Sequence, residues 1–350
     1  MATGDLIFAD SFQHYKTAAG VLSPAWTSIV SAMTSAVVGD DNRMFDTGGI
    51  YDQTLLAAGN GSGAWSKTLP ASYAAGTVGT YFRTGVVTSG GLIVALLDSG
   101  TLQLDVRYTA TGAITVTRNG TVLATSTNTL AVNTAYHIEL LATISDAAGT
   151  YEVKVNGSST GWIPAATSQD TKNTANASFN EVRVYSRGSN DAGITNHRFA
   201  HLYVVEGLSS VGRYVGHTMR PAGAGYINDF TGNFGSNWLN LADPDNDSDS
   251  TFNQSATDTN KDAFVLQAAP TGTIHSVQAT LNVRQDAGSG HTIRAFLRIA
   301  GTNYYGAAQT VTATYQMLQW TWTVNPATGV AWVTADLAAG AIELGYERVS

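Results

Sequence analysis

Four aspartates alternate with other residues in the stretch DPDNDSDS, residues 243–250. Calcium takes about six to eight oxygen ligands, and alternating carboxylates in a loop can supply several of them. The EF-hand pattern is absent, because the sixth position of the stretch is Ser248 rather than glycine. We therefore expect either a structural calcium site or a solvated acidic loop folded by Asx-turns. The four candidate ligands are Asp243, Asp245, Asp247 and Asp249.

Two tryptophans lie in stretches rich in glycine and serine. Trp65 is in GSGAWSK and Trp162 is in SSTGWIP, both typical of loops rather than of alternating strands. An exposed aromatic ring can stack on the apolar face of a sugar, so both are candidate carbohydrate-binding residues. Either ring could equally fold back and cap a hydrophobic core. The residues alone leave both alternatives open.

Residue pairs that could catalyse hydrolysis are few. Asp105 and Glu139 are candidate partners if a cleft brings them to the roughly 5–10 Å that a glycosidase needs. His197 and His201 have the spacing of paired metal ligands on a helix, but their segment is typical of a strand, where four residues span about 13 Å. The chain contains no H-E-x-x-H, and its one G-x-S-x-G match, GSSTG over 157–161, stands at a predicted hairpin turn rather than in a strand–turn–helix nucleophile elbow. We expect a protein that is not an enzyme.

The elements that must position these residues are strands. In TLQLDVRY, residues 101–108, apolar and polar residues alternate with the two-residue period of a half-buried strand. Asn119-Gly120 and Asn156-Gly157 stand where two-residue hairpin turns are expected. Hairpins at this spacing predict an antiparallel β-sandwich with few, short helices. Further strands are predicted over 136–144, 151–157, 181–187 and 197–207.

A second series of strands begins near residue 261, after a Gly/Ser-rich stretch. The stretch WTWTVNPATGVAWV, residues 320–333, places Trp320 and Trp322 on one face of a strand that ends in an Asn-Pro turn. We predict that this face closes the core of the second sandwich, with a sugar-stacking platform as the alternative. The predicted organisation is two antiparallel β-sandwich domains, 1–207 and 227–350, joined by a connector over 208–226.

Composition excludes several classes of partner. Charged residues make up 13% of the chain, against roughly 25% in an average soluble protein. The net charge is −8 and no cluster of Lys and Arg is present, so we expect no binding to nucleic acid or to an anionic membrane. The chain has no stretch of about 18 apolar residues, the length that is needed to span a bilayer. The absence of cysteine excludes disulfides and thiolate metal sites.

The first residues, MATGDLIFADSF, lack the basic start and the apolar run of a secretory signal. We therefore expect synthesis and folding in a cytoplasm. A charge-poor β protein rich in Thr, Ser and Gly fits a virion component that is assembled inside a host cell and released by lysis.

The first region resembles the concanavalin-like and laminin-G-like jelly rolls of viral and extracellular proteins. The resemblance rests on the order of its elements: FADSFQHY at the start, the Asn119-Gly120 and Asn156-Gly157 hairpins, and HRFAHLYVVEG near residue 207. Jelly rolls of this class commonly bind glycans through loop aromatics, Asn and Asp, sometimes with calcium.

The last 140 residues or so resemble a domain common in structural proteins of tailed bacteriophages. The motifs are Arg220-Pro221-Ala222-Gly223, Trp238 followed by Pro244, Asp245 and Asp247, and Asn325 through Trp332. The resemblance implies that the protein resides in a virion, and it implies no catalytic activity.

Together these observations predict a virion surface protein, tail- or fibre-associated, whose lectin-like first domain attaches to host glycans. Its expected partners are other virion proteins and host surface glycans, and a homotrimer is the expected assembly. The alternative is a head decoration protein that stabilises the capsid, and a more remote alternative is a polysaccharide depolymerase.

Overall fold

The computed structural model describes most of the chain, and its fold is nearly all β. The described chain contains one α-helix, α1 (Asn237–Ala242), and one 3-10 helix, η2 (Thr334–Leu337). The predicted all-β class with few, short helices is confirmed. No helix within the described ranges is long and apolar enough to cross a membrane. The described residues are 5–10, 26, 28–30, 35–39, 54–58, 64–85, 87–88, 90–185, 197–242, 249–269 and 271–350.

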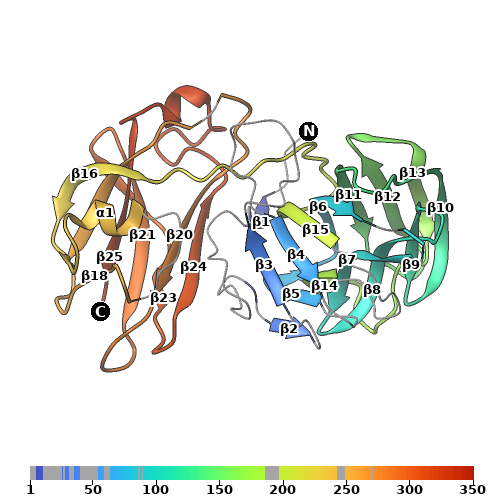
Figure 1. Ribbon diagram of the computed structural model, residues 1–350, viewed down its shortest axis with the longest axis horizontal. Coiled ribbons are helices and arrows are strands. Elements are labelled where there is room, and N and C mark those ends of the chain that lie inside the picture. The colour runs from blue at the N-terminus through green and yellow to red at the C-terminus, as the bar shows by residue number, and fades with distance from the viewer. Residues whose placement is uncertain are drawn as a thin grey trace. The chain divides into compact units, whose positions relative to one another are not determined.

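The described chain divides into two compact units, with the boundary between Gly216 and His217. Unit 1 contains two antiparallel sheets, and in Figure 1 its strands run from blue to yellow-green. Sheet A has the order β13-β12-β11-β6-β15-β4-β3, with β1 also paired to β15, and sheet B has the order β10-β9-β8-β7-β14-β5-β2. The strands of sheet A are β1 (Leu6–Asp10), β3 (Ser35–Gly39), β4 (Thr54–Ala58), β6 (Ala75–Thr84), β11 (Tyr136–Thr143), β12 (Gly149–Val155), β13 (Ser158–Gln169) and β15 (His197–Glu206). Those of sheet B are β2 (Ser28–Val30), β5 (Ala64–Tyr73), β7 (Gly91–Asp98), β8 (Thr101–Tyr108), β9 (Ala113–Arg118), β10 (Thr121–Thr129) and β14 (Phe179–Tyr185).

The two sheets of unit 1 pack face to face and form a β-sandwich. Phe82 of sheet A lies against Tyr108 of sheet B, with ring centroids 5.9 Å apart. The hairpins predicted from Asn-Gly pairs are present: Asn119 and Gly120 connect β9 to β10 with φ of 43° and 87°. Positive φ at both central residues is the geometry of a type I′ turn, whose twist matches that of the strands it joins.

Unit 2 is built around sheet C, which has the order β16-β19-β25-β21-β22 with β23 also paired to β21. The antiparallel pair of β20 and β24 provides its second layer, because Ala279 and Trp320 share one hydrophobic cluster with residues of sheet C. The strands are β16 (Pro221–Asn228), β17 (Thr231–Gly232), β18 (Asn253–Gln254), β19 (Lys261–Leu266), β20 (Val277–Val283), β21 (Thr292–Ile299), β22 (Thr302–Tyr305), β23 (Gln309–Thr310), β24 (Gln316–Trp322) and β25 (Ile342–Arg348).

The tryptophan stretch closes this core, as predicted. Trp320 and Trp332 are 5% and 3% exposed, and the indole N–H of Trp332 donates to the Trp322 carbonyl over 2.8 Å. The turn between them is held by the Asn325 side chain, which accepts the Ala327 N–H at 2.9 Å. A sugar-stacking role for Trp320 and Trp332 is excluded by their burial.

The predicted connector over 208–226 is mostly not a free linker. Its first half, up to Gly216, lies along the outer face of sheet A, where Tyr214 packs on Tyr203 with ring centroids 5.1 Å apart. Its last residues form β16, an edge strand of sheet C that pairs with β19. Gly212, whose φ of 75° favours glycine, donates its N–H to the Glu139 carboxylate at 3.1 Å.

Candidate functional site

The outer face of sheet B, which points away from the core, carries a group of charged side chains. Strand pairing places Ala95 of β7 between Arg183 of β14 and Asp105 of β8, and places Thr117 of β9 beyond Asp105. Side chains alternate across a sheet, so these residues point away from the core residues beside them. We call this set the polar face: Ser66, Asp105, Arg107, Thr117, Glu181, Arg183 and Tyr185.

The first charge pair on the polar face joins Arg107 to Asp105. The guanidinium binds the carboxylate with two hydrogen bonds of 2.7 and 2.8 Å, and the Thr117 hydroxyl donates a third at 2.6 Å. The Asp105 hydrogen bond is the main cause that raises the pKa of Arg107. The carboxylate is fully buried, while the Arg107 side chain stays 32% exposed. Asp105 thus fixes the Arg107 guanidinium in position, while part of the Arg107 side chain stays exposed to solvent.

The second pair, Arg183 and Glu181, repeats this arrangement on β14. Arg183 Nε donates to the Glu181 carboxylate at 2.5 Å, and the Ser66 hydroxyl donates to the same oxygen. Tyr185 lies beside this pair. Burial raises the pKa of its hydroxyl, and the neighbouring Arg183 opposes that shift. Arg183 is less exposed than Arg107, at 17%.

The polar face presents fixed hydrogen-bonding groups with no net charge. An arginine has five N–H donors in a planar fork, and Arg107 uses two of them on Asp105. The remaining donors are held by rigid strands, so a ligand does not have to order them on binding. A ligand with many hydroxyl groups, both donors and acceptors, matches such a surface better than a simple anion does, because each cation is already neutralised.

One end of the polar face is bounded by the loop over 170–178, which Gln103 of β8 anchors. The Gln103 amide nitrogen donates to Thr174 Oγ1 at 2.8 Å and to the Asn176 carbonyl at 2.9 Å. Its amide oxygen accepts the Asn173 N–H at 2.6 Å. Gln103 is fully buried, so its hydrogen bonds are made in a site without competing water.

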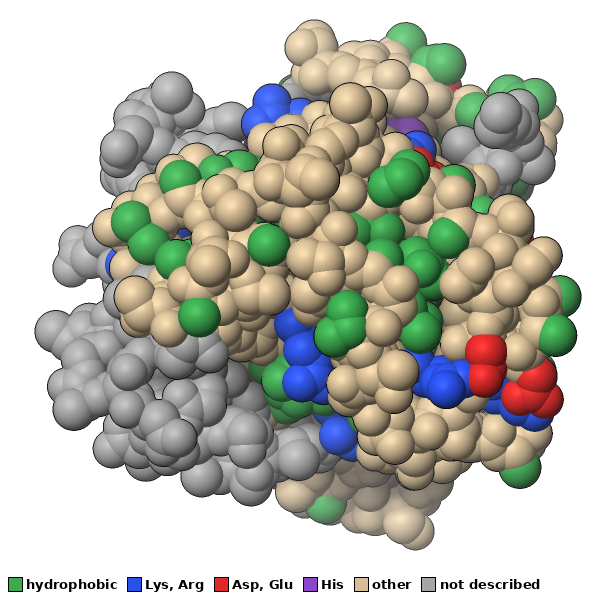
Figure 2. Space-filling model, turned by 90° about the vertical axis from the view of Figure 1, so that its right-hand side faces the viewer, with side chains coloured by type: hydrophobic (Ala, Val, Ile, Leu, Met, Phe, Trp, Pro, Cys, Tyr) green, Lys and Arg blue, Asp and Glu red, His purple; other side chains and the backbone are tan. Residues whose placement is uncertain are grey.

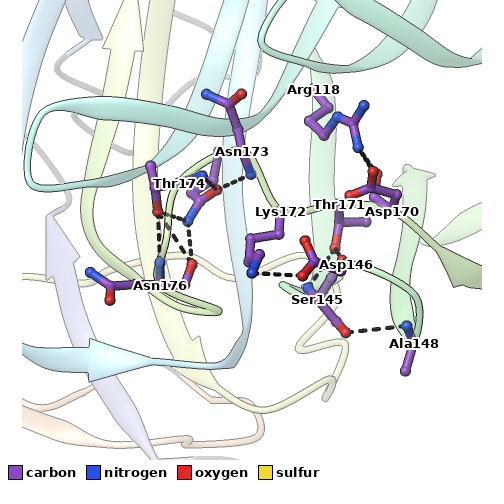
Figure 3. Close-up of polar contacts among 11 residues, drawn as sticks. Arg118, Ser145, Asp146, Ala148, Asp170, Thr171, Lys172, Asn173, Thr174 and Asn176 are labelled. Atoms are coloured by element: carbon purple, nitrogen blue, oxygen red, sulfur yellow. Dashed lines mark hydrogen bonds and ion pairs between the residues drawn. The ribbon is translucent and has the colours of Figure 1, made fainter.

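The same loop is also tied to sheet A and to β9, as Figure 3 shows. Thr171 Oγ1 donates to the Thr143 carbonyl at 2.7 Å, and Lys172 forms an ion pair of 2.7 Å with Asp146. Arg118, at the end of β9, forms an ion pair with Asp170. The loop therefore bridges the two sheets as a rigid wall rather than as a mobile lid.

Replacing Gln103 by alanine is expected to destabilise unit 1 by about 2 kcal/mol, because several buried loop groups lose their partner. Urea denaturation followed by tryptophan fluorescence measures this loss. Gln169→Ala is the matched control, because its amide donates only to the exposed Thr167 carbonyl. Equal stability of Gln103→Ala and Gln169→Ala would show that Gln103 does not hold the loop.

Trp65 does not lie in an exposed loop, so that prediction is wrong. It is in β5, is 2% exposed, and packs edge-on against Trp26 with ring centroids 5.5 Å apart. The flanking glycines and serines suggested a loop, but pairing of β5 with both β14 and β2 holds the segment in the sheet. Trp65 belongs to the core and cannot stack on a sugar.

Trp162 is also in a strand rather than a loop, but its ring is only half-buried. It lies in β13 and packs edge-on against Tyr136, with ring centroids 6.1 Å apart. Its carbohydrate-binding role stays a prediction.

Asp105 and Glu139 are not a catalytic pair, because they lie on different sheets. Glu139 points to the outer face of sheet A, where the connector covers it. Its carboxylate accepts hydrogen bonds from Tyr203 Oη at 2.5 Å and from Ser210 Oγ at 2.8 Å. It also accepts the N–H groups of Val211 and Gly212 at 3.0 and 3.1 Å.

His197 and His201 do not form a metal site either. His197 hydrogen-bonds the Tyr108 hydroxyl in the core at 2.7 Å, whereas His201 accepts the Gly216 N–H at 3.2 Å on the connector side. Within the described ranges, no group of three or more His, Cys, Asp or Glu side chains is placed to hold a metal ion.

The acidic loop is described only at Asp249. Its carboxylate accepts hydrogen bonds from Tyr315 Oη at 2.6 Å and from Arg284 at 3.0 Å, and these, the Tyr315 bond first, lower its pKa. Calcium binding by this loop stays a prediction. The other three candidate ligands, Asp243, Asp245 and Asp247, lie outside the described residues.

Sequence reasoning missed the polar face, although its signal is present. DVR and EVRVY each place an acid and an arginine two residues apart around a valine, which puts the charged pair on one face of a strand. The pattern indicates a polar outer face. It does not indicate that β8 and β14 are separated by β7 alone.

No protein-family model matches this chain, and no curated protein sequence matches it. Among solved structures, the alginate lyase Aly36B is 12% identical with a TM-score of 0.35, covering 48% of this chain and 84% of its own. The carbohydrate-binding module CBM66 from Bacillus subtilis is 10% identical with a TM-score of 0.31, covering 52% of this chain and 97% of its own. A sialidase matches at 12% identity with a TM-score of 0.35 over 45% of this chain, and this chain spans only 16% of the sialidase's length. Enzymes and a binding module both occur among these structures, so the likeness does not distinguish the two classes.

Proposed function

We propose that this protein is a non-enzymatic glycan-binding protein and that the polar face of unit 1 binds the sugar. The observation that carries the proposal is the pair of arginines, Arg107 and Arg183, each fixed by a buried carboxylate, with 32% and 17% of their side chains exposed. Such a surface offers oriented donors to sugar hydroxyls at a low cost in side-chain entropy.

The same geometry favours binding over hydrolysis. Both carboxylates of the polar face are occupied, Asp105 by Arg107 and Thr117 and Glu181 by Arg183 and Ser66. A general acid needs a carboxyl group within reach of the leaving oxygen, free to give up its proton. Asp105 and Glu181 lie on strands that are separated by β7, which puts their backbones about 10 Å apart, and they also lie in different rows of the sheet. This distance exceeds the separation of the two carboxyl groups in a retaining glycosidase.

We further propose that the protein resides on a bacteriophage virion and that sugar binding serves attachment to host glycans. The motifs of the last 140 residues or so support the virion, and the surface of unit 1 suits repeated contact with sugars. In Figure 2, most of the described surface is tan, which marks backbone and side chains that are neither charged nor hydrophobic. A head decoration protein is the alternative, and a homotrimer is the proposed assembly in either case.

An array of neutral and acidic glycans probed with the full chain tests the sugar-binding part. The proposal expects binding to at least one neutral oligosaccharide that survives 0.5 M salt, because neutralised arginine pairs contribute hydrogen bonds rather than net charge. An array without any bound glycan would contradict it.

Immunogold labelling of intact particles tests the virion part. Label confined to the tail supports host attachment, and label spread over the head supports the decoration alternative. Particles without label, with the protein free in the lysate, would contradict residence in the virion.

A further inference from the structure

A second cluster of charged and aromatic side chains covers the outer face of sheet C in unit 2. Three rows run across the neighbouring strands β19, β25 and β21: Lys261–Glu347–Arg294, then Ala263–Gly345–Phe296, then Val265–Glu343–Arg298. We call the cluster the tyrosine–arginine face. Its members are Tyr226, Lys261, Arg294, Arg298, Asn303, Tyr305, Glu343 and Glu347.

Two tyrosines form the raised parts of this face. Tyr226 is 43% exposed and Tyr305 is 36% exposed, and both pack against the buried ring of Phe296. Phe296 in turn lies directly over Gly345, where a Cβ would come within 2.1 Å of the ring. The glycine therefore lets the aromatic layer sit close to the sheet, and the two tyrosines are held by packing rather than free to rotate.

Arginines stack on both tyrosines. The guanidinium of Arg298 lies 3.7 Å from the Tyr226 ring centroid, and that of Arg294 lies 3.9 Å from the Tyr305 ring centroid. Asn303 lies between them and donates to the Tyr226 hydroxyl at 2.6 Å. Each cation is thus presented in a defined plane, with its in-plane N–H groups directed along the surface.

The charge on this face differs from that of the rest of unit 2. Residues 217–350 contain six Lys and Arg and eleven Asp and Glu, yet the face has three of the cations and only two of the acids. Glu347 pairs with Arg294 at 3.0 Å and with Lys261 at 3.8 Å. Among the described residues, Arg298 has no carboxylate within ion-pair distance and hydrogen-bonds only the Asn303 amide oxygen, at 3.1 Å. Glu343 stands opposite Arg298 on the neighbouring strand but accepts the Tyr226 N–H at 3.1 Å instead of pairing with it. Arg298 therefore keeps N–H donors for a carboxylate on a ligand.

We propose that the tyrosine–arginine face is a second binding site, for an acidic polysaccharide whose sugars carry carboxylates. A planar guanidinium binds a carboxylate with two parallel hydrogen bonds, and Asn303 and the tyrosine hydroxyls supply partners for neighbouring hydroxyl groups. Tyr and Arg are also enriched in protein interfaces, but Lys261, Glu343 and Glu347 on the same face belong to residue types that interface cores lack, so a protein partner fits less well. The site differs from the polar face of unit 1, where each arginine is already neutralised.

Titration of the full chain with alginate, a polyuronate, tests this proposal, with neutral dextran and poly-glutamate as comparison ligands. Arg298→Gln should weaken alginate binding about tenfold, and added salt should weaken it further. Arg284→Gln is the matched control, because Arg284 also stacks on a tyrosine and lies in unit 2, but pairs with Asp249 and Asp286 away from this face. The alginate affinity of Arg284→Gln should stay within twofold of that of the unchanged protein.

Lys154→Gln controls for a lost cation in unit 1 outside the polar face, and it should leave alginate affinity within twofold. Three results would overturn the proposal: no alginate binding by the unchanged chain, equal alginate binding by Arg298→Gln, or binding of poly-glutamate but not alginate with the same dependence on Arg298. The last result would identify an acidic protein segment as the ligand.

Discussion

Lowering the pH from 7 to 4.5 is expected to destabilise unit 1 by about 2.5 kcal/mol through the buried His137. Burial lowers the pKa of His137 to about 4, opposed by Glu139 and assisted by Arg213 and His201. The unfolded chain binds a proton near pH 6.5 and the folded chain only near pH 4. Stability is therefore lost as the pH falls below 6.5, and the loss levels off below about pH 4.

Urea denaturation at pH 7 and pH 4.5 measures this effect in the unchanged protein and in His137→Gln, which cannot be protonated. The variant should lose about 2.5 kcal/mol less between the two pH values. His291→Gln is the control, because His291 lies in unit 2 and its replacement should leave the acid response of unit 1 intact. Parallel losses in His137→Gln and the unchanged protein would show that His137 is not responsible.

Replacing Glu139 by alanine is expected to destabilise unit 1 by about 3 kcal/mol or more, because it removes the shared acceptor of four hydrogen bonds in a buried site. Three of the four donors, the Ser210 hydroxyl and the N–H groups of Val211 and Gly212, belong to the connector. The variant should therefore also release the connector from sheet A. Hydrogen exchange detects this as lost protection at Val211 and Gly212.

Glu152→Ala is the matched control for Glu139→Ala. Glu152 is on the neighbouring strand of the same sheet and makes only a loose ion pair of 3.9 Å with Lys154. Its replacement should cost less than about 1 kcal/mol and leave the connector amides protected. Unchanged protection at Val211 and Gly212 in Glu139→Ala would contradict the role given to Glu139.

The strand framework was predictable because its signals are local. Alternation predicted 101–108 as a strand with the bounds that β8 has, and Asn119-Gly120 identified the hairpin that follows. The tryptophan strand was correctly assigned to the core, since Trp320 alternates with polar residues on a single strand. Trp65 was misplaced because its glycine and serine neighbours are a local signal, whereas its position in β5 depends on pairing with β14, more than a hundred residues away.

The candidate sites depend on which strands are neighbours, and this information is not local. The arginine and the acid of each charge pair are visible in DVR and EVRVY, but only the order of sheet B places them on either side of Ala95. Glu139 stands in the strand predicted over 136–144, and nothing in that local pattern indicates that its side chain is buried. The connector residues that bury it lie about 70 positions further along the chain.

Titration of Arg183 variants against a glycan bound in the array tests sugar binding by the polar face most directly. Arg183→Gln should weaken binding at least tenfold, because the side chain loses its charged fork. Arg183→Lys should recover only part of the affinity, since an ammonium does not reproduce the planar donors. Lys154→Gln is the control, because it removes the same charge from the outer face of sheet A. Its glycan affinity should stay within twofold of that of the unchanged protein. Glycan binding that Arg183→Gln leaves within twofold of the unchanged protein would contradict the account.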